Sequence, residues 1–175
     1  MDFDTSYWND GCDIIPYERD MAFAINKKRG TIVYLGEWNF EKNVPHGNGK
    51  QYKSIGKCER DDGRVINDTY YPFGKILHKG YWNNGVLQGY GHHWFPNGTM
   101  YKGGWDNNKM NGYGIYYNSN KKIEQKGTWK DGNIFNGYGR KVFKNKSYFI
   151  GDIHNGEITQ NGKLFNKYGD QLSVI

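Results

Sequence analysis

The chain has 175 residues, the length of a single domain; 36% of them are hydrophobic, and aromatic residues alone supply 17%. Tyrosine (15), phenylalanine (9) and tryptophan (6) stand beside 25 glycines and few branched aliphatic residues, so we expect a thin structure whose rings lie on backbone. No apolar run reaches the roughly 18 residues that span a bilayer, and the acidic N-terminus is unlike a signal peptide.

The charge distribution, the cysteines and the residue usage bear on the cellular compartment and the source genome. Residues 1–77 carry 11 Lys/Arg against 12 Asp/Glu, and residues 78–175 carry 13 against 6, so the net charge of +6 divides into −1 and +7. Cys12 and Cys58 are isolated and lack metal-ligand spacing, which favours a reducing cytoplasm. Asn (20), Lys (19), Ile (14) and Tyr (15), whose codons are AT-rich, make up 68 residues and indicate an AT-rich genome.

The first 29 residues show little of the pattern that follows. Trp8 and Gly11 give one W-x-x-G step and nothing more. We expect an N-terminal cap or a frayed strand over residues 1–29 and a repeat domain over residues 30–175.

Five recognisable units then follow, with a period of about 23 residues, and internal repeats of this kind predict a solenoid. Residues 57–77 have the length of a further unit, but Arg60 replaces the tryptophan and Asn67 and Thr69 replace a glycine pair, so we interpret them as a degenerate unit. The five units read Tyr34-x-Gly36-x-Trp38, His78-x-Gly80-x-Trp82, Tyr101-x-Gly103-x-Trp105, Gly127-x-Trp129 and Phe149-x-Gly151-x-Ile153, each with glycines downstream, such as Gly89-x-Gly91 and Gly112-x-Gly114.

Each unit predicts a β-hairpin. In Tyr101-x-Gly103-x-Trp105 the three residues point to one face of a strand, because strand side chains alternate. Asn and Asp with Gly then supply turn chemistry, and the glycines of the return strand leave room for a ring from a neighbouring strand. A single hairpin is marginal in water, so we expect the hairpins to stack side by side.

This Y-x-G-x-W-x-x-G-x-x-x-G-x-G layout resembles the MORN (membrane occupation and recognition nexus) repeat over about residues 30–170. The resemblance implies an all-β, elongated single-sheet solenoid of tandem hairpins, with an aromatic groove that binds an extended or helical segment of a partner protein. The alternative is that the same rings form the core; we favour the exposure of at least some of them. The groove residues would be Tyr34, Trp38, Trp82, Tyr101, Trp105 and Trp129.

The residues do not predict an enzyme, a cofactor or a metal site. Asp61 and Asp62 are adjacent, as are His92 and His93, so the members of each pair face opposite ways on a strand. No G-x-S-x-G elbow occurs, and the glycine pairs recur as structure without the strand–loop–helix setting of a nucleotide loop.

Three other partners remain as alternatives. An anionic membrane lipid is one, and single-stranded nucleic acid is a less favoured second. We expect a cytoplasmic chain, at the periphery of a membrane or of the cytoskeleton. A second copy of the chain is the third, because residues 172–175 form an apolar strand at a sheet edge. The candidate contacts for an anion are Lys121, Lys122, Lys126, Arg140 and Lys141.

Overall fold

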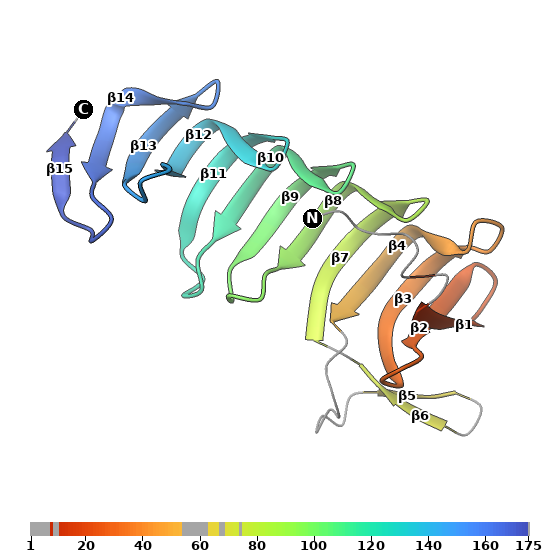
Figure 1. Cartoon of the computed structure of the whole chain (residues 1–175). Coiled ribbons are helices and arrows are strands. Elements are labelled where there is room, and N and C mark those ends of the chain that lie inside the picture. The colour runs from red at the N-terminus through yellow and green to blue at the C-terminus, as the bar shows by residue number, and fades with distance from the viewer. Residues whose placement is uncertain (1–7, 9–10, 54–62, 67–68, 74, 175) are drawn as a thin grey trace. The chain divides into compact units, whose positions relative to one another are not determined.

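The computed structural model describes residues 8, 11–53, 63–66, 69–73 and 75–174, and the side chains of these except for 63–72 (Figure 1). Strands joined by turns make up nearly all of this part of the chain, and within it only Trp8 and Gly11 have helical backbone. No helix in it is long and apolar enough to cross a membrane. The prediction of an all-β chain of tandem hairpins is confirmed.

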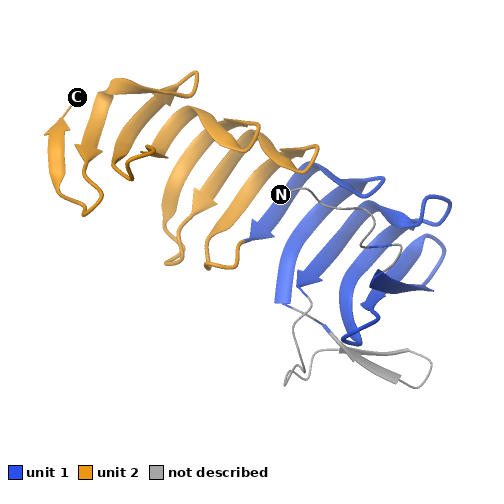
Figure 2. Ribbon diagram, in the orientation of Figure 1, with its two compact units in different colours: residues 1–94 blue, residues 95–175 orange. Residues whose placement is uncertain are grey.

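The chain divides into two compact units, residues 1–94 and residues 95–175 (Figure 2). In unit 1 six antiparallel strands follow one another in the sheet order β1-β2-β3-β4-β7-β8. They are β1 (Cys12–Pro16), β2 (Met21–Asn26), β3 (Thr31–Asn39), β4 (Val44–Lys53), β7 (Lys75–Asn83) and β8 (Val86–Trp94).

The seven strands of unit 2 are antiparallel and follow one another in chain order. They are β9 (Met100–Asp106), β10 (Lys109–Tyr117), β11 (Ile123–Lys130), β12 (Asn133–Val142), β13 (Tyr148–His154), β14 (Glu157–Phe165) and β15 (Gln171–Val174).

Two stretches differ from expectation. The first is the predicted degenerate unit, of which Arg60 and Asn67 lie outside the described residues. Its described strands β5 (Gly63–Ile66) and β6 (Thr69–Pro72) pair only with each other, and β4 pairs directly with β7, so this stretch is not a hairpin of the larger sheet. The second is the N-terminal stretch, where β1 and β2 form a regular hairpin in the sheet of unit 1.

In four hairpins of the described part of the chain, a ring lies on a pair of glycines. Gly103 of β9 faces Gly114 of β10 across the strand pair, and the Tyr101 ring covers both. The Tyr101 hydroxyl donates a hydrogen bond to the carbonyl oxygen of Gly104, at 3.2 Å. The same arrangement recurs with Tyr34 on Gly36 and Gly49, His78 on Gly80 and Gly91, and Phe149 on Gly151 and Gly162.

Successive hairpins are also joined at their turns. The backbone N–H of a turn glycine donates to a carbonyl of the preceding hairpin in three places: Gly85 to Pro45 (2.7 Å), Gly132 to Met110 (2.9 Å) and Gly156 to Phe135 (2.7 Å). Each of these glycines has a positive φ, a backbone conformation that glycine adopts without a steric penalty.

Candidate binding surfaces

The six rings predicted to line a groove define one face of each unit, here called the ring face; the opposite face is the outer face. All six are buried, with between 0% and 7% of their surface exposed. An open groove along these rings is therefore not what the structure shows. Whether a partner contacts them stays a prediction.

The rings are buried because they pack on one another. In unit 1 the Tyr34 ring lies 5.3 Å from that of Trp82, edge to face, and 5.5 Å from that of Trp38. Trp8 closes this cluster with a centroid 5.8 Å from Tyr34. Burial, with the Glu37 carboxylate adding to it, raises the pKa of Tyr34, so its hydroxyl stays protonated and donates to the Glu37 carbonyl.

Unit 2 repeats the arrangement. The Tyr101 ring lies 5.1 Å from Trp129 and 5.5 Å from Trp105, both edge to face, and the Trp129 indole N–H donates to the Gly114 carbonyl at 3.3 Å. Edge-to-face pairs add about 0.5–1.5 kcal/mol to the burial of the rings themselves. These rings are first of all the core of the hairpins.

The ring stack is interrupted at one hairpin of unit 2. Gln125 occupies the position that Tyr34, His78, Tyr101 and Phe149 hold in the other hairpins, and it lies over Gly139, where an added Cβ would sit 2.6 Å from its Cγ. The shorter side chain borders a pocket of about 580 Å³. The pocket is also lined by Trp129, Ile134, Phe135, Arg140, Lys141 and Gly156.

The pocket is lined by apolar side chains and by charged residues of both signs, Lys130, Asp131, Arg140 and Lys141. Lys141 projects from β12, where its ammonium contacts the Gly156 carbonyl and lies 3.0 Å from the Glu157 carboxylate. The Glu157 side chain is 82% exposed, so this ion pair is open to exchange with another carboxylate. An apolar side chain accompanied by an acid fits this site.

The five cations predicted to contact an anion do not form one patch. Lys121 and Lys122 lie in the turn between β10 and β11, and Lys126 is exposed on the outer face. The Arg140 guanidinium lies 3.6 Å from the Glu124 carboxylate and 3.9 Å from the Tyr148 ring centroid, so its charge is already partnered. Lys141 borders the pocket.

A row of lysines, which includes Lys121 and Lys122, follows the turns that join one hairpin of unit 2 to the next. The turns at residues 118–122, 143–147 and 166–170 share one hydrogen-bond pattern and lie at the same end of the sheet. Neighbouring turns are separated by two strands, or about 10 Å. They carry Lys121, Lys122, Lys144, Lys146 and Lys167, with Asp170 the one acid among them. In the sequence, the regular spacing of these turns was the feature from which the row of lysines could have been predicted.

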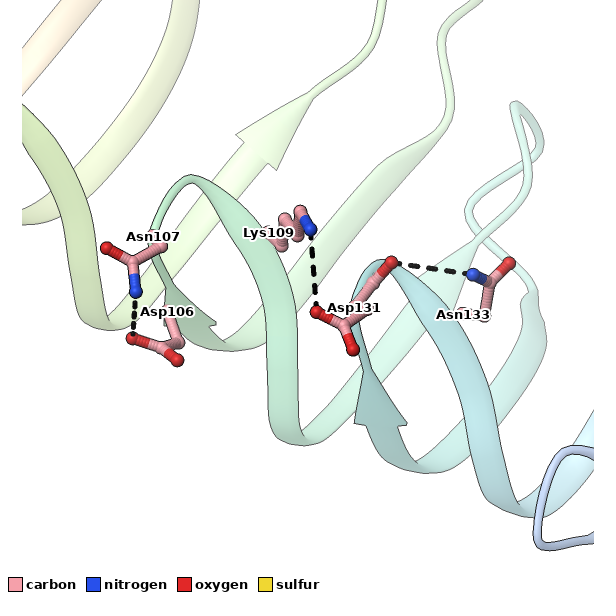
Figure 3. A network of polar contacts seen from close by, with 5 residues as sticks. All are labelled: Asp106, Asn107, Lys109, Asp131 and Asn133. Carbon is pink, nitrogen blue, oxygen red and sulfur yellow. Dashed lines mark hydrogen bonds and ion pairs between the residues drawn. The ribbon is translucent and has the colours of Figure 1, made fainter. Parts of the chain in front are cut away.

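The hairpin turns at the other end of unit 2 carry charges of both signs (Figure 3). The Lys109 ammonium lies 3.5 Å from the Asp131 carboxylate and so links two successive turns. The Asn107 amide donates to the Asp106 carboxylate at 3.2 Å, and the Asn133 amide to the Asp131 carbonyl at 3.4 Å. The excess of positive charge is thus confined to the opposite end and to the faces.

Exposed rings lie on the outer face, where sequence reasoning did not place them. Tyr90, Tyr113 and Tyr138 each stand between two glycines of a return strand, and each is 55–59% exposed. The sequence feature that could have predicted them is their position between the two glycines, because strand alternation directs that residue to the face opposite the buried rings.

Two histidines are buried in unit 1. His78 Nδ1 and His93 Nδ1 are 3.4 Å apart, and the His78 ring lies edge to face 5.1 Å from Trp82. Burial, with repulsion from His93 and His92, lowers the pKa of His78 to about 3, and burial lowers that of His93 to about 4. Both are therefore neutral at pH 7. Within the described residues no three His, Cys, Asp or Glu side chains gather where they could hold a metal.

Comparison with known proteins agrees with the repeat pattern. Residues 34–58, 78–100 and 101–122 match the family model of the MORN repeat. No curated protein matches the chain. The matched segments contain the complete aromatic-glycine-tryptophan pattern, whereas the later hairpins have Gln125 or Ile153 in it.

Proposed function

The chain carries three MORN repeats, and we propose that it is a non-enzymatic module that binds a segment of a partner protein on the ring face of unit 2. MORN repeats are common in protein-binding and membrane-binding modules. The observation that carries the proposal is the pocket of about 580 Å³ beside Trp129, at the hairpin where the ring stack is interrupted.

The pocket suggests what the partner presents. An aromatic or large aliphatic side chain would occupy the space that a ring occupies in the other hairpins and would contact Trp129, Ile134 and Phe135. A carboxylate next to it would replace Glu157 at the Lys141 ammonium. Residues that fill such pockets contribute most of the binding energy of an interface.

Filling the pocket from inside tests the proposal. Gln125→Tyr restores the ring of the other hairpins, and Thr128→Tyr adds the same ring to the exposed outer face of the same strand. The wild type and both variants are used to capture partners from the native host, with quantitative mass spectrometry. The proposal predicts a protein that the wild type and Thr128→Tyr retain and that folded Gln125→Tyr loses. Equal retention by all three would contradict it.

One observation favours a second candidate, binding to an anionic membrane surface. Unit 2 holds 12 Lys/Arg and 6 Asp/Glu, a net +6, and five of its lysines lie on the row of turns described above. Each basic residue near an anionic surface contributes about 1 kcal/mol. Changing Lys121, Lys122, Lys144 and Lys146 to Gln should then release the chain from vesicles with anionic lipid. The same change at Lys28, Lys42, Lys53 and Lys75 of unit 1 should not, and equal loss in both sets would sink this candidate.

A further inference from the structure

Two lysines face each other on the outer face of unit 1. Lys50 of β4 is the direct cross-strand partner of Lys79 of β7, and both side chains are exposed. Like charges in directly opposite positions destabilise a strand pair. Protection of a sheet edge does not explain them, because β4 and β7 are each paired on both sides.

The equivalent positions of the other hairpins avoid this arrangement. In the described strands the row that contains Lys50 and Lys79 elsewhere sets a cation against a residue that is not Lys or Arg. The pairs are Leu35 with Lys50, Lys79 with His92, Lys102 and Lys126 with Ile115, and Arg140 and Lys163 with Ile150. Among the described strand pairs, lysine therefore faces lysine in the β4–β7 pair alone, where Lys53 and Lys75 form a second such pair beside Lys50 and Lys79.

Lys50 and Lys79 also line a shallow, largely apolar pocket. Met21 and Leu35 line it together with Lys50 and Lys79, and three glycines leave its floor as bare backbone; its volume is about 310 Å³. Within the described residues no acid forms an ion pair with either lysine. The acid two residues from Leu35 on the same face, Glu37, instead accepts hydrogen bonds from the backbone and side-chain nitrogens of Asn48.

We propose that Lys50 and Lys79 form a binding site for an organic phosphate monoester, whose apolar group lies on Met21 and Leu35. A phosphate monoester carries close to two negative charges at pH 7 and three acceptor oxygens, so it matches the two ammonium groups of a cross-strand lysine pair. The apolar neighbours distinguish this ligand from free inorganic phosphate. The site lies in unit 1 and does not depend on the pocket beside Trp129.

Titration of the full chain with phenyl phosphate, followed by NMR, tests the site. The wild type should bind phenyl phosphate saturably and more tightly than inorganic phosphate. Lys50→Gln and Lys79→Gln should each weaken phenyl phosphate binding by about tenfold or more, since each removes a charge-assisted contact. Lys163→Gln, which removes an equal charge from the same row in unit 2, should leave the affinity within about twofold of the wild type.

Two further measurements keep the result interpretable. Thermal melting should show that both Gln variants are folded, and Lys50→Arg and Lys79→Arg should retain binding because they keep the charges. Absence of saturable binding by the wild type would overturn the proposal. So would equal affinity for phenyl phosphate and inorganic phosphate, or an equal loss in Lys163→Gln.

Discussion

The ring of Tyr101 lies so close to the backbone of Gly114 that a Cβ at this glycine would sit 2.5 Å from the ring carbon Cζ. Tyr34 stands in the same relation to Gly49, at 2.6 Å from Cζ. A glycine under the aromatic ring is therefore a packing requirement of the hairpins that carry such a ring. It explains why the glycines recur in register with the rings.

Substitution of Gly114 by Ala should destabilise unit 2 by about 1–3 kcal/mol, because the methyl group forces the Tyr101 ring off its site. The control is the same substitution in a Tyr101→Ala background, where the ring that the methyl group meets is absent, so Gly114→Ala should cost less there. Chemical denaturation of the single and double variants measures both costs. An equal cost in the two backgrounds would contradict the packing argument.

The buried and exposed rings should differ in what they stabilise. Trp105→Ala removes a side chain that is 7% exposed and should lower the free energy of unfolding by about 3–5 kcal/mol. Tyr113→Ala removes a ring that is 57% exposed, so its effect should stay within about 0.5 kcal/mol. Denaturant unfolding of the two variants measures both. If Trp105→Ala were as stable as the wild type, the ring would not be part of the core, and the interpretation of Trp105 as an open-groove residue would be favoured.

Acid should destabilise unit 1 through its two histidines. The pKa values of His78 and His93 are lowered to about 3 and about 4 in the folded chain, while an unfolded histidine has a pKa of about 6.5. As the pH falls below about 6.5, the unfolded state takes up protons that the folded state does not, so stability is lost. The loss can approach about 1.4 kcal/mol per pH unit for each histidine, until the pH nears the folded-state values.

The control for this pH dependence is His78→Tyr, which installs the residue of the Tyr34 and Tyr101 hairpins. Unfolding free energies at pH 7.5 and pH 5 should differ less in this variant than in the wild type. An unchanged difference would show that other groups cause the acid sensitivity.

The turns of unit 2 hold two lysines in a backbone conformation that favours glycine. Lys121 and Lys146 have φ values of 61° and 65°, and glycine occupies the equivalent positions 98 and 169. Lys121→Gly should stabilise the chain by up to about 1 kcal/mol, because left-handed backbone costs a residue with a Cβ about that much. Lys122→Gly, at an ordinary φ, should be neutral or destabilising. Melting temperatures in the opposite order would refute this assignment of strain.

The repeat made most of the fold predictable, because ring, glycine and turn residues recur at fixed spacing and each has one structural explanation. The hairpin β1–β2 was harder to predict, since Ala22, Phe23, Ala24 and Ile25 are buried on both faces and show no alternation. The separate pair β5–β6 depends on β4 meeting β7 across the intervening residues, a long-range pairing that has no local signal. The elongated shape stays a prediction that small-angle scattering would test.

The site was only partly predictable. The sequence singled out Trp129, Arg140 and Lys141, which border the pocket, but not the role of Gln125, because a missing ring has no positive signal. Strand alternation placed the rings of Tyr34 and Tyr101 on one face, yet it could not reveal that their neighbours cover them. Burial depends on the stacking of successive hairpins, which is a property of the folded unit.

Hydroxyl-radical footprinting of the complex tests most directly whether a partner occupies the ring face of unit 2. Phe135 and Lys141 border the pocket, whereas Tyr113 and Tyr138 are exposed on the opposite face and serve as internal controls. With the captured partner bound, the account predicts reduced oxidation of Phe135 and Lys141 and unchanged oxidation of Tyr113 and Tyr138. Protection of the two tyrosines, with Phe135 and Lys141 as reactive as in the free chain, would contradict it.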